Sequence, residues 1–218
     1  MVKSFFKKIL FPVLSFVYNI YSAKERGYSY KGINVRVMPG VFHPGLFFST
    51  KLLIEYLSKL DLKNKTVLEL GAGSGLISIY CAKQNAIVTA TDINPTAVIN
   101  INKNAELNNV KITVLESDLF DKIEKENYDY MIINPPYFPK DPTSDKEFAW
   151  YCGSDFKYFK KLFSQLNNYR TESNVLLILS EDCDFNRINS IANECNFKLN
   201  LVLQKKVLWE QNFIYTIE

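Results

Sequence analysis

VLELGAGSGLISIYCAK, residues 67–83, is the stretch that decides the fold. A short apolar run passes into a helical pattern through three of the chain's eight glycines, at positions 71, 73 and 75. Glycine permits positive φ angles and lets a ligand approach the backbone closely. In an open α/β sheet such a loop lies at the carboxyl edge of the strands, where ligands bind. We therefore predict a strand over 65–70, a ligand-binding turn and a helix over Leu76–Lys83.

Strands and helices alternate along the rest of the chain. The expected strands cover residues 86–92, 110–118, 128–134, 174–180, 197–203 and 213–217, and the expected helices cover 95–109, 155–168 and 184–195. This alternation predicts βαβ units with right-handed crossovers, helices on both faces and a mostly parallel sheet. Only a short polar stretch separates the last two strands, so we expect them to pair antiparallel at one edge.

Composition is typical of one globular unit. The chain has 218 residues, of which 47% are hydrophobic and 22% charged. Its net charge of +3 is too small to indicate a nucleic-acid-binding protein by itself. The four cysteines form no Cys-x-x-Cys pair, and His43 is the lone histidine. Neither a zinc site nor a disulfide framework is therefore expected, and reduced thiols indicate a cytoplasmic protein.

The amino terminus, KSFFKKILFPVLSFVYNIYSAK (residues 3–24), is apolar but interrupted. It is shorter than the roughly 20 apolar residues that a membrane-spanning helix needs. Its apolar residues recur at helical intervals. We predict an amphipathic helix packed on the domain or on a partner, with peripheral membrane contact as the alternative.

The spacing of the glycines restricts the class of ligand that this loop can bind. No Gly-Lys-Ser/Thr follows, which excludes a Walker-type phosphate loop, and Gly-x-Gly-x-Gly differs from the Gly-x-Gly-x-x-Gly of dinucleotide folds. Asp92 ends the second strand, where an acid binds ribose hydroxyls. A helix cap is its alternative role, but Asn94 is better placed to cap the helix that starts at Pro95.

The motif E-L-G-A-G-S-G with the following T-D-I-N resembles the class I S-adenosylmethionine-dependent methyltransferases over about residues 60–218. The resemblance implies a seven-stranded, doubly wound α/β sheet whose last strand is inserted antiparallel. Residues 59–218 would form this domain. Residues 1–58 would precede it as an N-terminal helical extension, which consists of the amphipathic helix and a substrate-side segment. The cofactor would be S-adenosylmethionine, with S-adenosylhomocysteine as product.

The same resemblance implies a set of cofactor-binding residues. The glycine loop would pass under the methionine part of the cofactor, Asp92 would bind its ribose, and Asp118 would reach the adenine amino group. The full set is Glu69, Gly71, Ala72, Gly73, Gly75, Asp92, Ile93, Asp118, Leu119 and Asn134.

MIINPPYFP, residues 131–139, ends an apolar run in Asn134-Pro135-Pro136-Tyr137. The Asn134 side-chain oxygen and the Pro135 carbonyl offer two acceptors for the hydrogens of a flat, weakly nucleophilic nitrogen. Such acceptors hold the nitrogen in line and stabilise positive charge that grows on it. The prolines fix the backbone, and Tyr137 stacks on the substrate. The structural alternative is a turn that ends a strand, with a surface tyrosine.

This motif resembles those of HemK-type glutamine N5-methyltransferases and of adenine N6-methyltransferases. Residues 134–163 are similar to the short eukaryotic and archaeal HemK relatives, which lack a helical domain and often work with a small partner protein. Cys152 stands where that family commonly has a glycine. The family's Pro-x-x-Asp-Thr is replaced by Pro44 and Thr50 at wider spacing without an acid.

We expect Pro136, Tyr137, His43 and Thr50 to bind the substrate. A turn histidine and a helix N-cap threonine are the structural alternatives for the last two.

Three functions remain open on the sequence alone. The favoured one is methylation of a protein glutamine, with a translation termination factor as substrate. The second is adenine-N6 methylation of tRNA, rRNA or DNA, in which the phosphates would meet Lys157, Lys160, Lys161, Lys205 and Lys206. The third is a non-catalytic interaction protein that retains the cofactor fold. A small-molecule acceptor is not excluded by the sequence.

Overall fold

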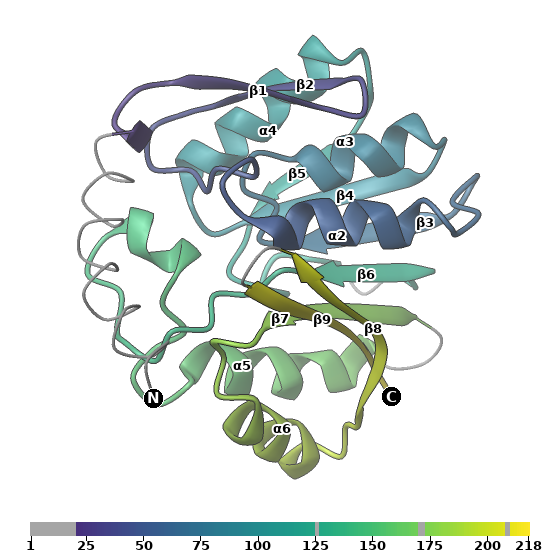
Figure 1. Cartoon of the computed structure of the whole chain (residues 1–218). Coiled ribbons are helices and arrows are strands. Elements are labelled where there is room, and N and C mark those ends of the chain that lie inside the picture. The colour runs from purple at the N-terminus through teal and green to yellow at the C-terminus, as the bar shows by residue number, and fades with distance from the viewer. Residues whose placement is uncertain (1–20, 125–126, 170–172, 208–209) are drawn as a thin grey trace.

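A seven-stranded sheet organises the chain, and the computed structural model describes residues 21–124, 127–169, 173–207 and 210–218 (Figure 1). The strand order is β5-β4-β3-β6-β7-β9-β8. The strands are β3 (Thr66–Leu70), β4 (Ile87–Asp92), β5 (Thr113–Glu116), β6 (Tyr130–Ile133), β7 (Asn174–Ser180), β8 (Leu199–Val207) and β9 (Glu210–Ile217). β3 to β7 run parallel, and β9 is antiparallel to both β7 and β8. The predicted α/β sheet with an inserted antiparallel last strand is confirmed.

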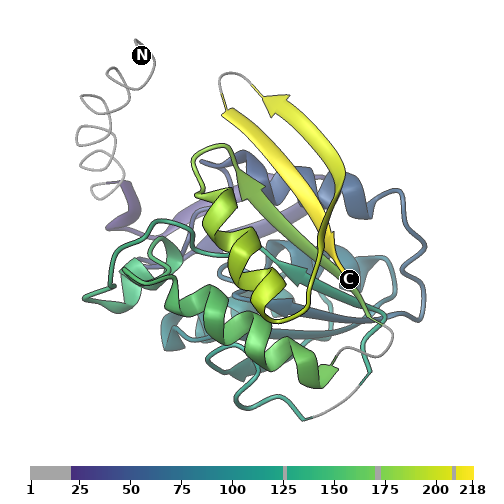
Figure 2. The same ribbon diagram turned by 90° about the horizontal axis from the view of Figure 1, so that it is seen from below.

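Five helices of the described chain cover the two faces of this sheet. α2 (Phe48–Leu57), α3 (Leu76–Lys83) and α4 (Pro95–Leu107) lie on one face, and α5 (Lys157–Leu166) and α6 (Phe185–Glu194) on the other (Figures 1 and 2). β7 shows why both faces are apolar. Leu177 and Leu179 pack in the core under α5 and α6, whereas Leu176 and Ile178 pack in the core under α2 and α3. A strand buried on both sides has to be hydrophobic throughout.

The order of the strands reverses between β3 and β6. The chain passes outward from β3 to β5 and then returns to pair β6 beside β3, with Leu70 opposite Ile133. In open α/β sheets this point leaves a crevice at the carboxyl ends of the strands. The glycine loop follows β3, and Asn134 follows β6. The tips of these two strands therefore lie side by side.

An antiparallel hairpin precedes the sheet, and the sequence reading missed it. It consists of β1 (Arg26–Tyr30) and β2 (Ile33–Val37), joined by Lys31 and Gly32, which both have positive φ. The hairpin lies within residues 1–58, which were predicted to precede the sheet as a helix and a substrate-side segment. Residues 3–20 of the predicted amphipathic helix, which was expected within residues 3–24, lie outside the described part of the chain. Among the described helices, none has the length and apolar character to cross a membrane.

Three buried asparagines of α4 bind the free edge of β2. Asn100, Asn104 and Asn108 lie one helical turn apart and are at most 8% exposed. Their side-chain oxygens accept from the backbone N–H groups of residues 38, 36 and 34, at 2.9, 2.8 and 3.2 Å. Their amide nitrogens donate to the carbonyls of residues 36 and 34. This asparagine ladder supplies the hydrogen bonds that a further strand would supply.

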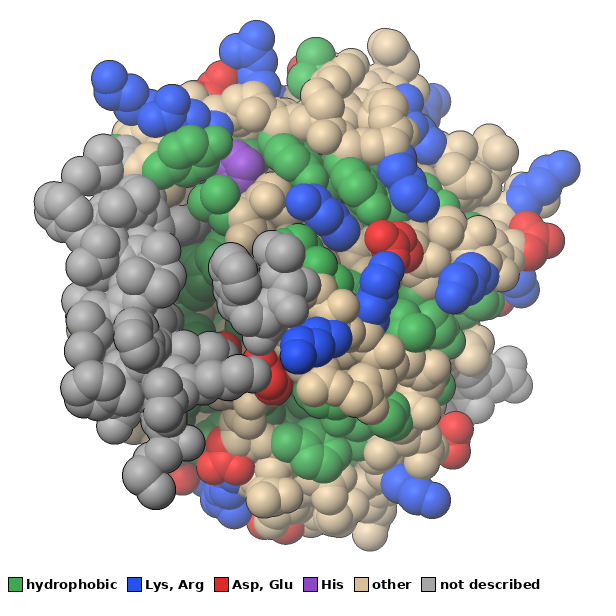
Figure 3. Space-filling view, in the orientation of Figure 1, with side chains coloured by type: hydrophobic (Ala, Val, Ile, Leu, Met, Phe, Trp, Pro, Cys, Tyr) green, Lys and Arg blue, Asp and Glu red, His purple; other side chains and the backbone are tan. Residues whose placement is uncertain are grey.

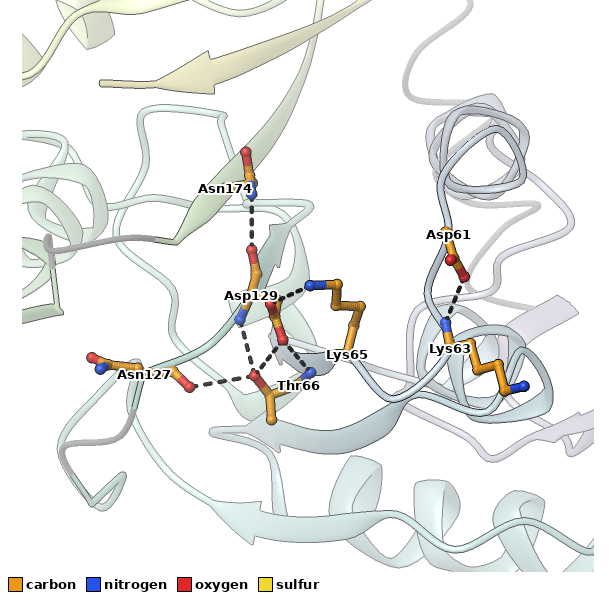
Figure 4. A network of polar contacts seen from close by, with 7 residues as sticks. All are labelled: Asp61, Lys63, Lys65, Thr66, Asn127, Asp129 and Asn174. Carbon is orange, nitrogen blue, oxygen red and sulfur yellow. Dashed lines mark hydrogen bonds and ion pairs between the residues drawn. The ribbon is translucent and has the colours of Figure 1, made fainter.

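A second polar network fixes the amino ends of three strands (Figure 4). The Asp129 carboxylate, just before β6, accepts from Lys65 Nζ at 2.9 Å and from the Thr66 N–H at 2.8 Å. The Asp129 carbonyl accepts from the Asn174 N–H, which begins β7. The hydrogen bonds with Lys65 and Thr66 lower the pKa of Asp129. Because β3 and β6 are aligned here, their opposite ends, Leu70 and Ile133, reach the crevice at one level.

The ladder makes a prediction about stability. Replacing Asn104 with Leu leaves the N–H of Arg36 and the carbonyl of Ser74 without their Asn104 partner, whereas the carbonyl of Arg36 keeps the Asn100 amide. Each buried group left unsatisfied costs about 1–3 kcal/mol. We expect the free energy of unfolding, measured by urea denaturation, to fall by at least ~2 kcal/mol. Asn102→Leu on the exposed side of α4 is the matched control, and equal losses in both variants would contradict the role of the ladder.

Candidate active site

A cavity of about 490 Å³ opens at the carboxyl ends of β3 and β6. Its walls come from the loops after β3, β4, β5 and β6, from the segment between β2 and α2, and from residues 138–161. Of the predicted site residues, Gly71, Gly73, Asp92, Ile93, Asp118, Leu119, Asn134, Pro135, Pro136 and Tyr137 line it. The topology therefore gathers most of the predicted residues around one space.

The glycine loop is fastened to Asp92. The Gly73 N–H donates to Asp92 Oδ2 at 2.8 Å, and the Asn94 N–H donates to Asp92 Oδ1 at 2.9 Å. Burial raises the pKa of Asp92, although these backbone hydrogen bonds oppose the shift. Each carboxylate oxygen keeps a lone pair for a further donor. Asn94 caps α4 by accepting from the Thr96 N–H, as predicted.

The glycines of this loop serve different purposes. All three have positive φ, between 56° and 77°. A Cβ on Gly71 would meet no atom within 4 Å, so the backbone there is open to a ligand in the cavity. A Cβ on Gly75 would lie 3.0 Å from the Ile101 side chain, so that glycine permits close packing of α3 on α4. Gly75 and its buried neighbour Ala72 lie behind the cavity wall.

Glu69 is buried beneath the loop and does not line the cavity. Its Oε2 accepts from the Ser78 N–H at 2.8 Å and from the Ser78 hydroxyl. Burial raises the pKa of Glu69 to about 8, against the effect of these two hydrogen bonds. Glu69 therefore joins the end of β3 to the first turn of α3 and supports the loop from below.

Residues 117–119 form the opposite end of the cavity. Leu119 has a φ of 54°, a left-handed conformation that is rare for a leucine. Ser117 holds it there, because its Oγ donates to the Leu119 carbonyl and accepts from the Lys122 N–H. The neighbouring Asp118 carboxylate faces the Lys161 ammonium at 2.6 Å. A strained residue held by its surroundings is typical of a ligand-binding loop.

The Asn134 amide is oriented by Ser49. Asn134 Nδ2 donates to Ser49 Oγ at 3.2 Å, and both residues line the cavity. With its nitrogen engaged, Asn134 keeps Oδ1 as an acceptor for a group in the cavity. Pro135 is buried, and Tyr137 forms a hydrogen bond with Ser180 while its ring lies 4.9 Å from that of Phe138. Burial raises the pKa of Tyr137 strongly, so its phenol is neutral.

His43 and Thr50 do not line the cavity, which corrects the prediction for both. His43 is buried between Tyr21 and Tyr28, and its Nδ1 accepts from the Gly45 N–H. Thr50 is buried inside α2 and is not its N-cap, because α2 begins at Phe48. The residue before it, Ser49, reaches the cavity instead.

The sequence reading missed an aromatic group at the cavity. Phe42 and Trp150 line the wall, and their rings pack with that of Phe47 at centroid separations of 4.8 to 5.4 Å. This group joins the segment before α2 to the loop after β6. Only the similarity of residues 134–163 to the HemK relatives pointed to Trp150, and no signal distinguished Phe42 from a core residue.

The loop after β6 closes on itself. The Phe138 N–H donates to the Trp150 carbonyl, and the Cys152 N–H donates back to the Phe138 carbonyl, each at 3.0 Å. The Asp141 carboxylate accepts from the Ser154 hydroxyl at 2.7 Å and from Lys157 Nζ at 3.0 Å. These contacts hold the Asp141 pKa at about 2. Residues 138–157 therefore form a preshaped wall of the cavity.

Comparison with known proteins points to one chemistry. The sequence profile of the methyltransferase small domain matches residues 32–150. A Methanocaldococcus jannaschii protein named as a protein N5-glutamine methyltransferase is 36% identical over 192 residues, covering 83% of this chain and 93% of that protein. The release factor glutamine methyltransferase of Fusobacterium nucleatum is 29% identical over 77% of this chain. This chain matches only 44% of that enzyme's length.

Solved structures share the fold. The E. cuniculi Mtq2–Trm112 complex, described as responsible for methylation of the eRF1 termination factor, aligns with a TM-score of 0.62 and 22% identity over 82% of this chain and 98% of that one. The T. thermophilus 16S rRNA N2 G1207 methyltransferase, solved with AdoMet and guanosine, aligns with a TM-score of 0.60 and 18% identity over 88% and 50%. At these identities the likeness concerns the fold alone.

Glu69 predicts how stability depends on pH. Its proton is held more tightly in the folded protein, with a pKa of about 8, than in the unfolded chain, where the ordinary value is 4.5. Its contribution is therefore complete below pH 4.5 and is lost as the pH rises towards 8. We expect the melting temperature of the Glu69→Gln variant to rise relative to that of the natural protein as the pH increases from 5 to 8. The exposed Glu106→Gln is the control, and a constant difference across this range would contradict the assignment.

Proposed function

The chain belongs to the methyltransferase small domain family, and on that premise we propose that it methylates the side-chain amide nitrogen of a protein glutamine, in a translation termination factor. S-adenosylmethionine is the cofactor of this methyltransferase. The observation that carries the glutamine assignment is the Asn134 amide, which lines the cavity beside Pro135 and whose nitrogen is engaged by Ser49. The names of the M. jannaschii and F. nucleatum relatives support the same acceptor.

The residues of one end of the cavity fit this cofactor. The open backbone at Gly71 lets the cofactor approach closely. The Asp92 carboxylate offers acceptors for the ribose hydroxyls, and the Asp118 carboxylate offers an acceptor for an amino group. Ile93 and Leu119 provide apolar surface beside them. When bound, the cofactor supplies an electrophilic methyl group on a sulfonium.

The residues of the other end hold the acceptor amide. The Asn134 Oδ1 and the Pro135 carbonyl can accept the two hydrogens of a glutamine amide and thereby fix the direction of its nitrogen. Positioning of this kind supplies ~7–11 kcal/mol towards a reaction barrier. Both acceptors also stabilise the positive charge that grows on the nitrogen during transfer. Tyr137 stays neutral, so it shapes the site rather than removing a proton, and the proton of the methylated nitrogen leaves to solvent.

The lysines argue against a nucleic-acid acceptor. Four of the five that could meet phosphates are engaged within the chain: Lys157 with Asp141, Lys160 with Asp155, Lys161 with Asp118 and Asp121, and Lys205 with Glu55. On the face in Figure 3, basic and acidic side chains of the described residues are interspersed. A phosphate backbone would have to compete with these carboxylates for the lysines and would meet their negative charge. We therefore rank adenine-N6 methylation below glutamine methylation.

Two further assignments accompany the proposal. We propose a cytoplasmic location, because all four cysteines are free and reduced thiols are usual there. We also propose that a small partner protein assists the enzyme, because the E. cuniculi relative is a complex with Trm112. Both are open to direct test by fractionation and by affinity purification.

Transfer of a labelled methyl group tests the acceptor. The purified protein is incubated with labelled S-adenosylmethionine and, in parallel, with termination factor, tRNA, rRNA or DNA. We expect label only in the termination factor, with mass spectrometry placing one added methyl group on a glutamine. Label in a nucleic acid instead would overturn the glutamine proposal while leaving the methyltransferase assignment intact.

Asn134 predicts a loss of turnover without loss of cofactor binding. Asn134→Ala removes one of the two acceptors for the amide, and loss of one such charge-stabilising contact lowers kcat on the order of 10²-fold. We expect the dissociation constant of S-adenosylhomocysteine, measured by calorimetry, to change by less than about threefold, roughly 0.7 kcal/mol. An Asn134→Ala enzyme with unchanged turnover would exclude this residue from catalysis.

Ser49 is predicted to act through Asn134. In Ser49→Ala the amide loses the contact that sets its direction, and we expect kcat to fall roughly tenfold, the value of one ordinary hydrogen bond. Ser49→Thr should retain turnover because it keeps the hydroxyl. In the Asn134→Ala background the Ser49→Ala change should have no further effect. If the fold-losses in kcat of the two single variants multiplied in the double variant, Ser49 would act independently of Asn134.

A further inference from the structure

Lys161 belongs to α5 and lines the cavity. Its Nζ contacts Asp118 Oδ2 at 2.6 Å and Asp121 Oδ2 at 2.7 Å. One turn further along α5, Gln165 donates to Asp121 Oδ1 and accepts from the Phe120 N–H. Residues 118–121 are thus held from two sides. Side chains of α5 contact Asp118, Phe120 and Asp121, and Ser117, next to β5, holds Leu119.

The contact decides which atom of Asp118 is available. Asp118 and Lys161 both line the cavity. With Oδ2 engaged by the ammonium, Oδ1 is the oxygen that remains to accept from a donor in the cavity. The Lys161 side chain is 33% exposed and that of Asp118 is 45% exposed. Ion pairs with this much exposure contribute little to folding stability, so the effect of Lys161 is expected in ligand choice.

We propose that Lys161 is a positioning residue for base selection, which holds the Asp118 carboxylate so that it accepts from an exocyclic amino group and rejects a carbonyl oxygen. The inference rests on the proposed placement of the cofactor base beside Asp118, and it does not depend on the methyl acceptor. A hypoxanthine base presents a carbonyl where adenine presents its amino group. A fixed carboxylate oxygen facing that carbonyl has no proton to share, so the site discriminates between the two bases.

Calorimetry with two ligands tests the proposal. S-adenosylhomocysteine and S-inosylhomocysteine are titrated into the natural protein, Lys161→Met, Lys161→Arg and Lys160→Met. The last is the matched control, because Lys160 is the adjacent lysine of α5 and pairs with Asp155. We expect Lys161→Met to reduce the preference for the adenine ligand by roughly tenfold. Lys161→Arg and Lys160→Met should retain the preference.

Two further measurements make the result decisive. In the Asp118→Ala background, Lys161→Met should leave the ratio of the two dissociation constants unchanged, because the residue then has nothing to position. Thermal melting identifies any misfolded variant, and Lys161→Gln replaces Lys161→Met if the latter does not fold. A preference that survives Lys161→Met, or that falls equally in Lys160→Met, would overturn the proposal. Because no methyl acceptor is used, failure of the glutamine assay leaves this result unaffected.

Discussion

The parallel pairing of β3 with β6 is the constraint on which the site depends. The two strands belong to different halves of the chain, yet Leu70 and Ile133 end them side by side. The residues that follow the two strands must therefore face the same space. The glycine loop after β3, whose backbone suits a sulfonium ligand, thus lies beside Asn134 after β6, whose amide suits a flat nitrogen. Register matters here because a slip of one residue would turn each side chain to the other face of the sheet. The polar network around Asp129 secures that register from the opposite end of the strands.

At the amino-terminal hairpin, helix α4 binds the edge of β2 that a further strand would otherwise pair with. Edge strands carry unpaired backbone groups that normally need a partner strand or water. The asparagine ladder satisfies those of β2 from the side of α4, and Asn104 extends the same hydrogen bonding to the carbonyl of Ser74 in the glycine loop. The segment that follows β2 carries Gly40, Val41 and Phe42 to the cavity wall. The ladder thus links the placement of that wall to the glycine loop.

Much of the sheet could be predicted from the sequence because its strands are short, apolar and separated by clear helical patterns. The predicted strand over 110–118 is shorter in the structure, since the Val110 N–H closes the end of α4 on the Ala105 carbonyl. The hairpin was missed because its partner is a row of asparagines, which read in sequence as a solvated helix face. Thr50 was chosen instead of Ser49 because Thr50 stands for the threonine of the family's Pro-x-x-Asp-Thr. Neighbouring helical residues point about 100° apart, so with the wider spacing in this chain the residue beside the matched one reaches the cavity.

The loop over residues 138–157 has a consequence for how such enzymes diversify. Its two ends are joined by the Phe138, Trp150 and Cys152 backbone contacts, and its tip is fastened by Asp141 to Ser154 and Lys157. The hydrogen bonds that join its ends and fasten its tip lie within the loop, while the rings of Trp150 on Phe42 and Phe47 and the buried side chains of Cys152 and Phe156 anchor it to the rest of the protein. A lineage can therefore exchange this loop as a cassette and acquire a new acceptor, while the nucleoside end of the cavity stays as it was.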